Sequence, residues 1–290
     1  MNRYERQERF FGTDGQKKLK QTRISVVGVG GLGCIVSQQL SLLGVGEITL
    51  IDSEELTDTD RNRNVFAYTS DSVPGTSKLD ITERYIRLSN ENIKVNKIYD
   101  SFVSERAFGY IKNSTHVFGC LDNEGSRLIL NELCSAYEVK YLDLASDIPV
   151  DALGEFGGSI MVNWDGDGCL YCMGQLDIKE AQEDLSTEDE KKDNERIYGV
   201  NRELLNRSGP SVVSLNGVVA SLAVTEFLMG VTEIRKPVRL LNYRGSRGIV
   251  NKSNDIPHTN CYYCKGIRGL KEKADIQRYI KNKVKTSKIL

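Results

Sequence analysis

The stretch that decides the fold is RISVVGVGGLGCIVSQQLSLLGVGEITLID, from Arg23 to Asp52, which predicts a strand, a glycine-rich turn, a helix and a second strand. Glycines allow a tight turn and let backbone N–H groups approach a phosphate; here they are Gly28, Gly30, Gly31 and Gly33. Asp52 ends the second strand about 20 residues later, where an acid can hydrogen-bond ribose hydroxyls. The stretch therefore predicts a site for a phosphate-bearing ribonucleotide, although it does not separate NAD from ATP.

Strands and helices alternate through the rest of the first half. Further apolar runs predict buried strands at 115–122 and 139–145, and periodic segments predict helices at 34–45, 77–90 and 125–138. Such alternation predicts βαβ units with helices on both faces of a parallel sheet. The expected fold is an α/β, Rossmann-like, doubly wound and mostly parallel sheet.

The residue composition and the hydrophobic pattern change in the second half of the sequence. Residues 153–172 suggest an antiparallel hairpin that runs into a turn, and 177–199 are dense in charge, which predicts an exposed, mobile crossover. Residues 211–231 are apolar on most helical faces and predict a deeply packed helix, and 238–250 predict a late strand or hairpin. We expect an antiparallel C-terminal extension of the sheet.

Composition and charge narrow the partners and the cellular location that we expect of the protein. The chain has 290 residues and a formal net charge of −1, so nothing global favours nucleic acid or anionic lipid as a partner, despite a basic tail. The charged start MNRYERQERFF does not suit a signal peptide, and no apolar run reaches the roughly 20 residues that span a bilayer. We expect a cytoplasmic protein whose seven cysteines are thiols or metal ligands.

Cations and a carboxylate after Asp52 favour a triphosphate over NAD. Transfer of a nucleotidyl group needs cations around the phosphates and a carboxylate for Mg²⁺. Residues 57–80 supply Arg61, Arg63 and Lys78, and VFGCLDN ends a strand with Asp122 and Asn123 at the ligand-binding carboxyl edge. Each has an ordinary alternative, because surface cations are usually solvated and Asp-Asn after a strand is often a turn or a helix cap.

These motifs together resemble the ThiF/MoeB/HesA family, the bacterial relatives of ubiquitin-activating (E1) enzymes. The similarity runs from Arg3 through TDRNRN, GTSKLD and CLDN to two Cys-x-x-Cys pairs, as far as Cys264. It implies that the glycine turn and Asp52 hold ATP, that Arg63 and Lys78 grip its phosphates, and that Asp122 binds Mg²⁺. We expect Asn62 and Asn123 at the same nucleotide.

The resemblance also implies an assembly. Arg6, in RYERQ, resembles an arginine that reaches the phosphates from the partner subunit, which implies a homodimer with composite sites. We expect a single adenylation domain with an N-terminal helical arm (1–22), a nucleotide-binding half (23–150), an acceptor-binding half with the cysteine pairs and crossover (151–268), and a basic tail (269–290).

One position departs from the family pattern. The family commonly has Ser-Asn-Leu-Asn/Gln-Arg-Gln where this chain has residues 59–64, TDRNRN, so Asp60 brings a negative charge where an amide is usual. The sequence leaves two alternatives: Asn62 or Arg61 compensates for the charge, or phosphate binding is weakened.

The two cysteine pairs, CLYC and CYYC, can each present two thiolates to one tetrahedral ion. The resemblance implies that the pairs meet at one structural zinc; the four ligands would be Cys169, Cys172, Cys261 and Cys264. A redox Cys-x-x-Cys motif is the alternative, but neither pair opens a helix after a strand. His258 lies nearby and is expected to be a loop residue.

The implied reaction is attack of a carboxylate on the α-phosphate of ATP, which gives an acyl-adenylate and pyrophosphate. A C-terminal carboxylate has a pKa near about 3.5 and needs no general base, so His116 and His258 can be bystanders. No cysteine lies between Met173 and Asn260, and Cys34, Cys120 and Cys134 are expected to be packing residues, so we expect no crossover thioester.

The implied acceptor is a ubiquitin-like or sulfur-carrier protein with a Gly-Gly tail. Three alternatives remain: a peptide carboxylate as acceptor in peptide-antibiotic modification, an NAD-binding oxidoreductase, and a nucleotide-binding partner protein that has lost activity.

Overall fold

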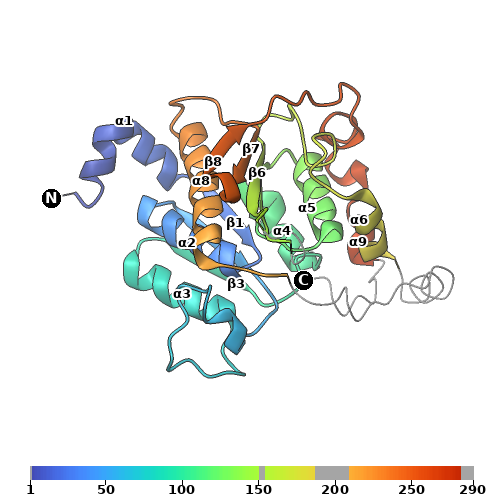
Figure 1. The fold of residues 1–290 in the computed structure, drawn as a ribbon. Coiled ribbons are helices and arrows are strands. Elements are labelled where there is room, and N and C mark those ends of the chain that lie inside the picture. The colour runs from blue at the N-terminus through green and yellow to red at the C-terminus, as the bar shows by residue number, and fades with distance from the viewer. Residues whose placement is uncertain (1, 150–153, 187–208, 282–290) are drawn as a thin grey trace.

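The computed structural model describes residues 2–149, 154–186 and 209–281, and its centre is one eight-stranded sheet (Figure 1). The strand order is β3-β2-β1-β4-β5-β6-β7-β8. The strands are β1 (Arg23–Val27), β2 (Glu47–Ile51), β3 (Lys94–Ile98), β4 (His116–Gly119), β5 (Lys140–Asp147), β6 (Gly157–Asn163), β7 (Leu240–Arg244) and β8 (Ile249–Lys252). The sheet is parallel from β3 to β5 and antiparallel from β5 to β8, as the sequence predicted.

Helices cover both faces of the sheet and enclose two apolar cores. One layer consists of α1 (Glu5–Lys20), α2 (Gly31–Leu43), α3 (Lys78–Ser89) and α8 (Val213–Val231). The opposite layer consists of α4 (Glu105–Asn113) and α5 (Glu124–Ala136), with α6 (Ile178–Leu185) packed on α5. Short helical turns complete the described elements: η1 (Asp58–Asp60), η2 (Gly245–Arg247), η3 (Tyr262–Gly266), η4 (Lys271–Ala274) and α9 (Arg278–Lys281).

The strand order places the switch point of the sheet between β1 and β4. The chain leaves β1 toward β2 and β3 on one side, and then returns to β4 and β5 on the other. Open α/β sheets bind ligands in the crevice that this reversal creates at the carboxyl ends of the strands. The glycine turn, Asp52 and Asp122 follow β1, β2 and β4 respectively, so all three lie along this edge.

The second half differs from the prediction in two details. Residues 153–172 do not form a hairpin by themselves, because β6 pairs with β5 on one side and β7 on the other. The charged crossover begins as a regular helix, α6, whose N-terminus is capped by Asp177; its continuation over 187–208 and the end of the basic tail lie outside the described residues. The late hairpin forms as predicted, as β7 and β8.

Helix α8 is long and apolar enough to cross a membrane, alone among helices of the described ranges. It instead packs against α2, β5 and β6, which makes it part of the core. Its burial is one-sided, contrary to the expected deep packing, since Ser214, Ser221 and Thr225 along its outer side are exposed. Its outer side forms, with α2, a shallow groove of about 470 Å³.

Candidate active site

The glycine turn combines three glycines that the fold requires with one that faces open space. Gly28 has φ +83°, and a Cβ added there would lie 2.5 Å from the Cys120 carbonyl oxygen. A Cβ at Gly33 would lie 2.0 Å from the Gly28 oxygen, and one at Gly31 would lie 2.5 Å from Asn216 Nδ2. A Cβ at Gly30 would meet no atom of the described residues within 4 Å. The turn is therefore closed toward the protein and open beside Gly30.

Asp52 anchors the turn at the end of β2. Its buried carboxylate accepts hydrogen bonds from the backbone N–H of Val29 (2.7 Å) and of Glu54 (2.8 Å). Burial raises the pKa of Asp52, against the opposing effects of these hydrogen bonds and the charge of Lys78. The bond to Val29 fixes the acid against the glycine turn, as expected of a ribose-binding residue.

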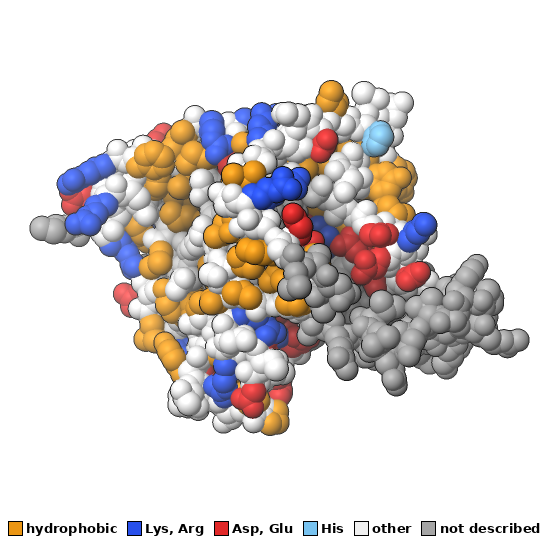
Figure 2. Space-filling model, in the orientation of Figure 1, with side chains coloured by type: hydrophobic (Ala, Val, Ile, Leu, Met, Phe, Trp, Pro, Cys, Tyr) orange, Lys and Arg blue, Asp and Glu red, His pale blue; other side chains and the backbone are white. Residues whose placement is uncertain are grey.

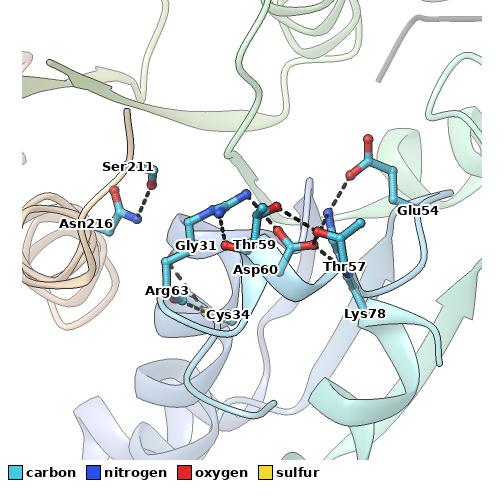
Figure 3. Close-up of polar contacts among 10 residues, drawn as sticks. All are labelled: Gly31, Cys34, Glu54, Thr57, Thr59, Asp60, Arg63, Lys78, Ser211 and Asn216. Carbon is cyan, nitrogen blue, oxygen red and sulfur yellow. Dashed lines mark hydrogen bonds and ion pairs between the residues drawn. The ribbon is translucent and has the colours of Figure 1, made fainter. Parts of the chain in front are cut away.

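Arg63 and Lys78 lie beside this turn (Figure 3). The aliphatic part of Arg63 crosses Gly31, since a Cβ there would lie 3.3 Å from both Cγ and Cδ of the arginine. Lys78 begins α3 and forms an ion pair with Glu54. Burial alone would lower the pKa of Lys78, but the hydrogen bond to Glu54 and the charges of Asp52 and Asp60 raise it, so the lysine is a cation.

Asp60 lies between these two cations. Its Oδ1 accepts a hydrogen bond from the Arg63 guanidinium at 2.7 Å, and its Oδ2 is 3.7 Å from Lys78 Nζ. The same Oδ2 accepts from the backbone N–H (2.9 Å) and hydroxyl (2.6 Å) of Thr57, in a capping box that begins η1. Burial alone would raise the pKa of Asp60, but the Thr57 hydrogen bonds and the charges of Lys78 and Arg63 lower it.

The residues that balance Asp60 are therefore not those that the sequence suggested. Arg61 pairs with Asp58 at 3.0 Å and donates to the carbonyl oxygens of Tyr68 and Asp71, which holds the loop after η1 together. Asn62 is exposed. Arg63 and Lys78 compensate for the Asp60 charge instead, because η1 directs positions 60 and 63 to the same side.

Asp122 and Asn123 lie where β4 passes into α5. Asp122 is exposed and has no hydrogen bond or ion pair with the described part of the chain. Asn123 is the N-cap of α5, since its side-chain oxygen accepts the Ser126 N–H at 2.7 Å. The ordinary alternative for Asn123, a helix cap, is thus observed, and a contact with nucleotide stays a prediction.

Two polar groups near this edge were not predicted. Asn216, in the apolar run VVSLNGVVAS of α8, donates to Ser211 at 3.0 Å and places its amide against Gly31, while its buried Oδ1 has no partner among the described residues. On α5, buried Arg127 pairs with Asp143 at 2.6 Å and also with Glu124. A single amide within an apolar helix was the available signal for Asn216; Arg127 gave none.

Arg6 lies far from the turn of its own chain. The neighbouring Tyr4 is packed at the other end of α2, where a Cβ added at Gly44 would lie 2.4 Å from the Tyr4 hydroxyl. Helix α2 has 13 residues and is therefore about 20 Å long. Arg6 is exposed and has no ion pair within the described residues.

The four cysteines of the two pairs come together although 92 residues separate Cys169 from Cys261. All four are buried, and their sulfur atoms lie within 4.8 Å of one another. Cys169 Sγ is 3.9 Å from Cys172 and 3.7 Å from Cys261, and Cys172 is 3.7 Å from Cys264. This cluster could hold a metal ion, and all seven cysteines of the chain are free of disulfides.

A model of the ThiF family matches residues 4–264 of the chain. The protein belongs to the ThiF family. The chain is 31% identical over 178 residues to the molybdopterin-synthase adenylyltransferase of Escherichia coli, covering 61% of this chain and 69% of that protein. It is 29% identical over 174 residues to the sulfur carrier protein ThiS adenylyltransferase of Bacillus subtilis, covering 59% and 50%. It is thus an enzyme of the ThiF adenylyltransferase type.

Solved structures share the fold of this ThiF-family chain. E. coli MccB crystallised with ATP covers 91% of the chain, and 74% of MccB is matched, with a TM-score of 0.70 and 19% identity. PaaA covers 87% of the chain, and 81% of PaaA is matched, with a TM-score of 0.63 and 19% identity. The mixed α/β sheet is therefore common to all three proteins.

The remaining cysteines of the ThiF-family chain are protonated thiols. Burial raises the pKa of Cys34 to about 11, and burial raises the pKa values of Cys120 and Cys134 as well. A thiol rather than a thiolate is a poor nucleophile. The burial of Cys34 and Cys134 agrees with the expectation that they are packing residues, and the expectation of no thioester stays a prediction.

Proposed function

We propose that this ThiF-family enzyme uses ATP and Mg²⁺ to activate the C-terminal carboxylate of a ubiquitin-like or sulfur-carrier protein as an acyl-adenylate. The observation that carries the proposal is the convergence of the open glycine turn, Asp52, Arg63 and Lys78 on one sheet edge. A redox site for NAD would need two phosphates bound, whereas two cations beside the turn suit a triphosphate.

The described residues fit ATP. Space beside Gly30 that no described residue fills leaves room for phosphate oxygens at the N-terminus of α2, and Oδ1 of Asn216, which has no partner among the described residues, offers an acceptor next to the same turn. Asp52 keeps lone pairs beyond its two backbone hydrogen bonds, and these can accept ribose hydroxyls. Asp122, exposed at the start of α5, is a hard oxygen ligand of the kind that Mg²⁺ uses together with substrate phosphates.

The chemistry that we propose requires that the acceptor carboxylate is aligned with the α-phosphorus and that the negative charge of the phosphates is neutralised. An oxygen of the acceptor carboxylate bonds to the α-phosphorus as the bond to the bridging oxygen of the β-phosphate breaks, and pyrophosphate leaves with that electron pair. The carboxylate is ionised at neutral pH, so no proton is removed. Arg63 and Lys78 offset the negative charge that moves onto the leaving group. Bound Mg²⁺ would add further charge neutralisation at the phosphates.

We also propose a homodimer in which Arg6 completes the partner's site. Arg6 lies near the end of α2 remote from its own turn, so it can serve a phosphate only in another subunit. A shallow groove between α2 and α8 supports a contact between subunits, because its lining combines apolar residues with uncharged, mostly small polar ones: Ile35, Gln39, Ser214, Gly217, Val218, Ser221, Leu222 and Thr225. Hydrophobic side chains gather on this face of the molecule (Figure 2).

We propose a structural zinc at the cysteine cluster. A tetrahedral zinc with bonds of about 2.3 Å to sulfur requires sulfur atoms about 3.8 Å apart. Three of the six sulfur–sulfur distances are 3.7, 3.7 and 3.9 Å and match this edge length, and all six are within 4.8 Å. Four thiolates leave no open position, so the ion would stabilise the fold and take no part in the reaction. Seven cysteines without a disulfide, four of them zinc ligands in this proposal, also support a proposed cytoplasmic location.

ATP–pyrophosphate exchange tests the main proposal. Wild-type protein with Mg²⁺ is assayed against a panel of Gly-Gly-terminated carrier proteins and short peptides. We expect exchange with a carrier, and a loss of about 10³-fold in Lys78→Ala. Lys94→Ala, which removes a 67% exposed lysine at the amino edge of the sheet, is the matched control. Exchange with a peptide alone would favour the peptide acceptor, and wild-type rates in Lys78→Ala would contradict the site.

A further inference from the structure

The phosphate-binding side of the candidate site carries more negative than positive charge. Two cations, Arg63 and Lys78, interact with three carboxylates: Asp52, Glu54 and Asp60. The side chain of Glu54 is 53% exposed, so solvent screens its charge. The side chain of Asp60 is 4% exposed and contacts both cations, so its charge, like that of buried Asp52, meets a phosphate chain with little screening.

Asp60 is held in place by hydrogen bonds at the start of η1. Its Oδ2 accepts two hydrogen bonds from Thr57 in the capping box, which fixes the carboxylate to the start of η1. Arg63 is held as well, because one guanidinium nitrogen donates to Oδ1 of Asp60 and another to the Thr59 carbonyl oxygen. A phosphate at the turn must therefore share Arg63 with a fixed carboxylate.

We propose that Asp60 is a positioning residue that holds Arg63 across the glycine turn and keeps the affinity for polyphosphates low, so that pyrophosphate leaves readily after adenylation. This inference rests on the proposed function. The repulsion grows with the charge of the phosphate chain, so it weakens ATP and pyrophosphate binding strongly and AMP binding little. Asp60 acts through Arg63 and Lys78 and need not touch the substrate.

Asp60→Asn tests the role of the negative charge at position 60, because asparagine is uncharged and has nearly the same shape as aspartate. Asp60→Asn keeps the size of the side chain and one oxygen to accept from Thr57, while it removes the negative charge between the cations. We expect about tenfold tighter binding of ATP and of pyrophosphate, and a change within about twofold for AMP. The KM for ATP falls and kcat does not rise, since pyrophosphate release becomes slower.

The experiment measures dissociation constants of ATP, pyrophosphate and AMP by calorimetry without added Mg²⁺, because bound Mg²⁺ would bring ATP and AMP to a similar net charge. Asp58→Asn is the matched control, because it removes the same charge from a side chain that is 83% exposed and two residues away. We expect no change there. Asp60→Ser serves as a second uncharged variant if Asp60→Asn does not fold, since a serine hydroxyl can replace the capping oxygen.

The possible results distinguish a failure of this inference from a failure of the proposed function. A ratio of AMP to ATP dissociation constants that is unchanged in the Asp60 variants, or ATP binding that weakens, would overturn the inference and leave Asp60 as a cap of η1 only. A wild-type protein that binds neither ATP nor pyrophosphate would overturn the proposed function, and this inference with it.

Discussion

Gly30 and Gly33 offer a sharp test of the nucleotide site, because alanine at Gly33 should lower the stability of the fold, whereas alanine at Gly30 should weaken ATP binding. A methyl group at Gly33 would lie 2.0 Å from the Gly28 oxygen, more than 1 Å inside normal contact, so the turn must move. We expect Gly33→Ala to lower the free energy of unfolding by about 3 kcal/mol or more. A methyl group at Gly30 meets no atom of the described part of the chain within 4 Å, and φ there is −79°. We expect Gly30→Ala to change that free energy by less than about 1 kcal/mol.

The effect of Gly30→Ala on ligand binding should be large. The methyl group would occupy the open side of the turn and keep phosphate oxygens from the backbone N–H groups. A hydrogen bond to a charged group contributes about 1.5–3 kcal/mol, so losing one or two weakens ATP binding by about 100-fold.

Urea unfolding and ATP calorimetry on the same preparations measure both quantities. Gly109→Ala, another glycine with no atom within 4 Å of an added Cβ, lies on α4 away from the site and is the control. Undiminished ATP affinity in Gly30→Ala would refute the reasoning, because the phosphates would then not lie on the turn.

Three further predictions follow from other contacts. Cys172→Ser should abolish stoichiometric zinc, measured by metal analysis, and lower the melting temperature by several degrees. The Arg84 hydrogen bonds lower the pKa of Asp71 below its unfolded value near 3.8. Their stabilisation is therefore complete above about pH 5 and is lost as pH falls through the folded pKa; the stability difference between wild type and Asp71→Asn, about 2 kcal/mol at neutral pH, should shrink below pH 4 in urea titrations. Arg6→Ala and Lys78→Ala should each be inactive alone but recover about a quarter of wild-type activity when mixed and allowed to exchange subunits; no recovery would argue against composite sites.

The parallel core of the fold could be predicted because burial on both faces makes its strands continuous apolar runs. β1, β2, β4 and β5 were found in this way. The edge strand β3, KVNKI, was missed because its side chains are mostly half-exposed and polar. The amphipathic α4 was missed because it is only nine residues long. The partner of β6 could not be predicted either, since pairing with β5 and β7 depends on tertiary packing.

The candidate site was predictable where a residue type implies its backbone position. Glycines in a strand–turn–helix and an acid at a strand end fall on the carboxyl edge whatever the side chains do. The direction of side chains in the irregular segment 53–76 could not be predicted, and Arg61 was therefore expected at the site. In the structure it instead donates hydrogen bonds that hold the loop after η1 together. Asn216 was missed because it comes from an element 160 residues and more beyond Asp52, brought close only by packing of α8 on α2.

The separation of the two cysteine pairs also sets an order of events during synthesis. Cys169 and Cys261 are 92 residues apart, so at about 5–20 residues per second the ribosome makes the second pair roughly 5 to 20 s after the first. A nascent chain has only two sulfur ligands during that interval, too few for a closed tetrahedral site. Capture of the proposed zinc therefore has to wait for Cys261 and Cys264, and a chain that stops before Cys261 has two of the four clustered cysteines and none of η3, η4 or α9.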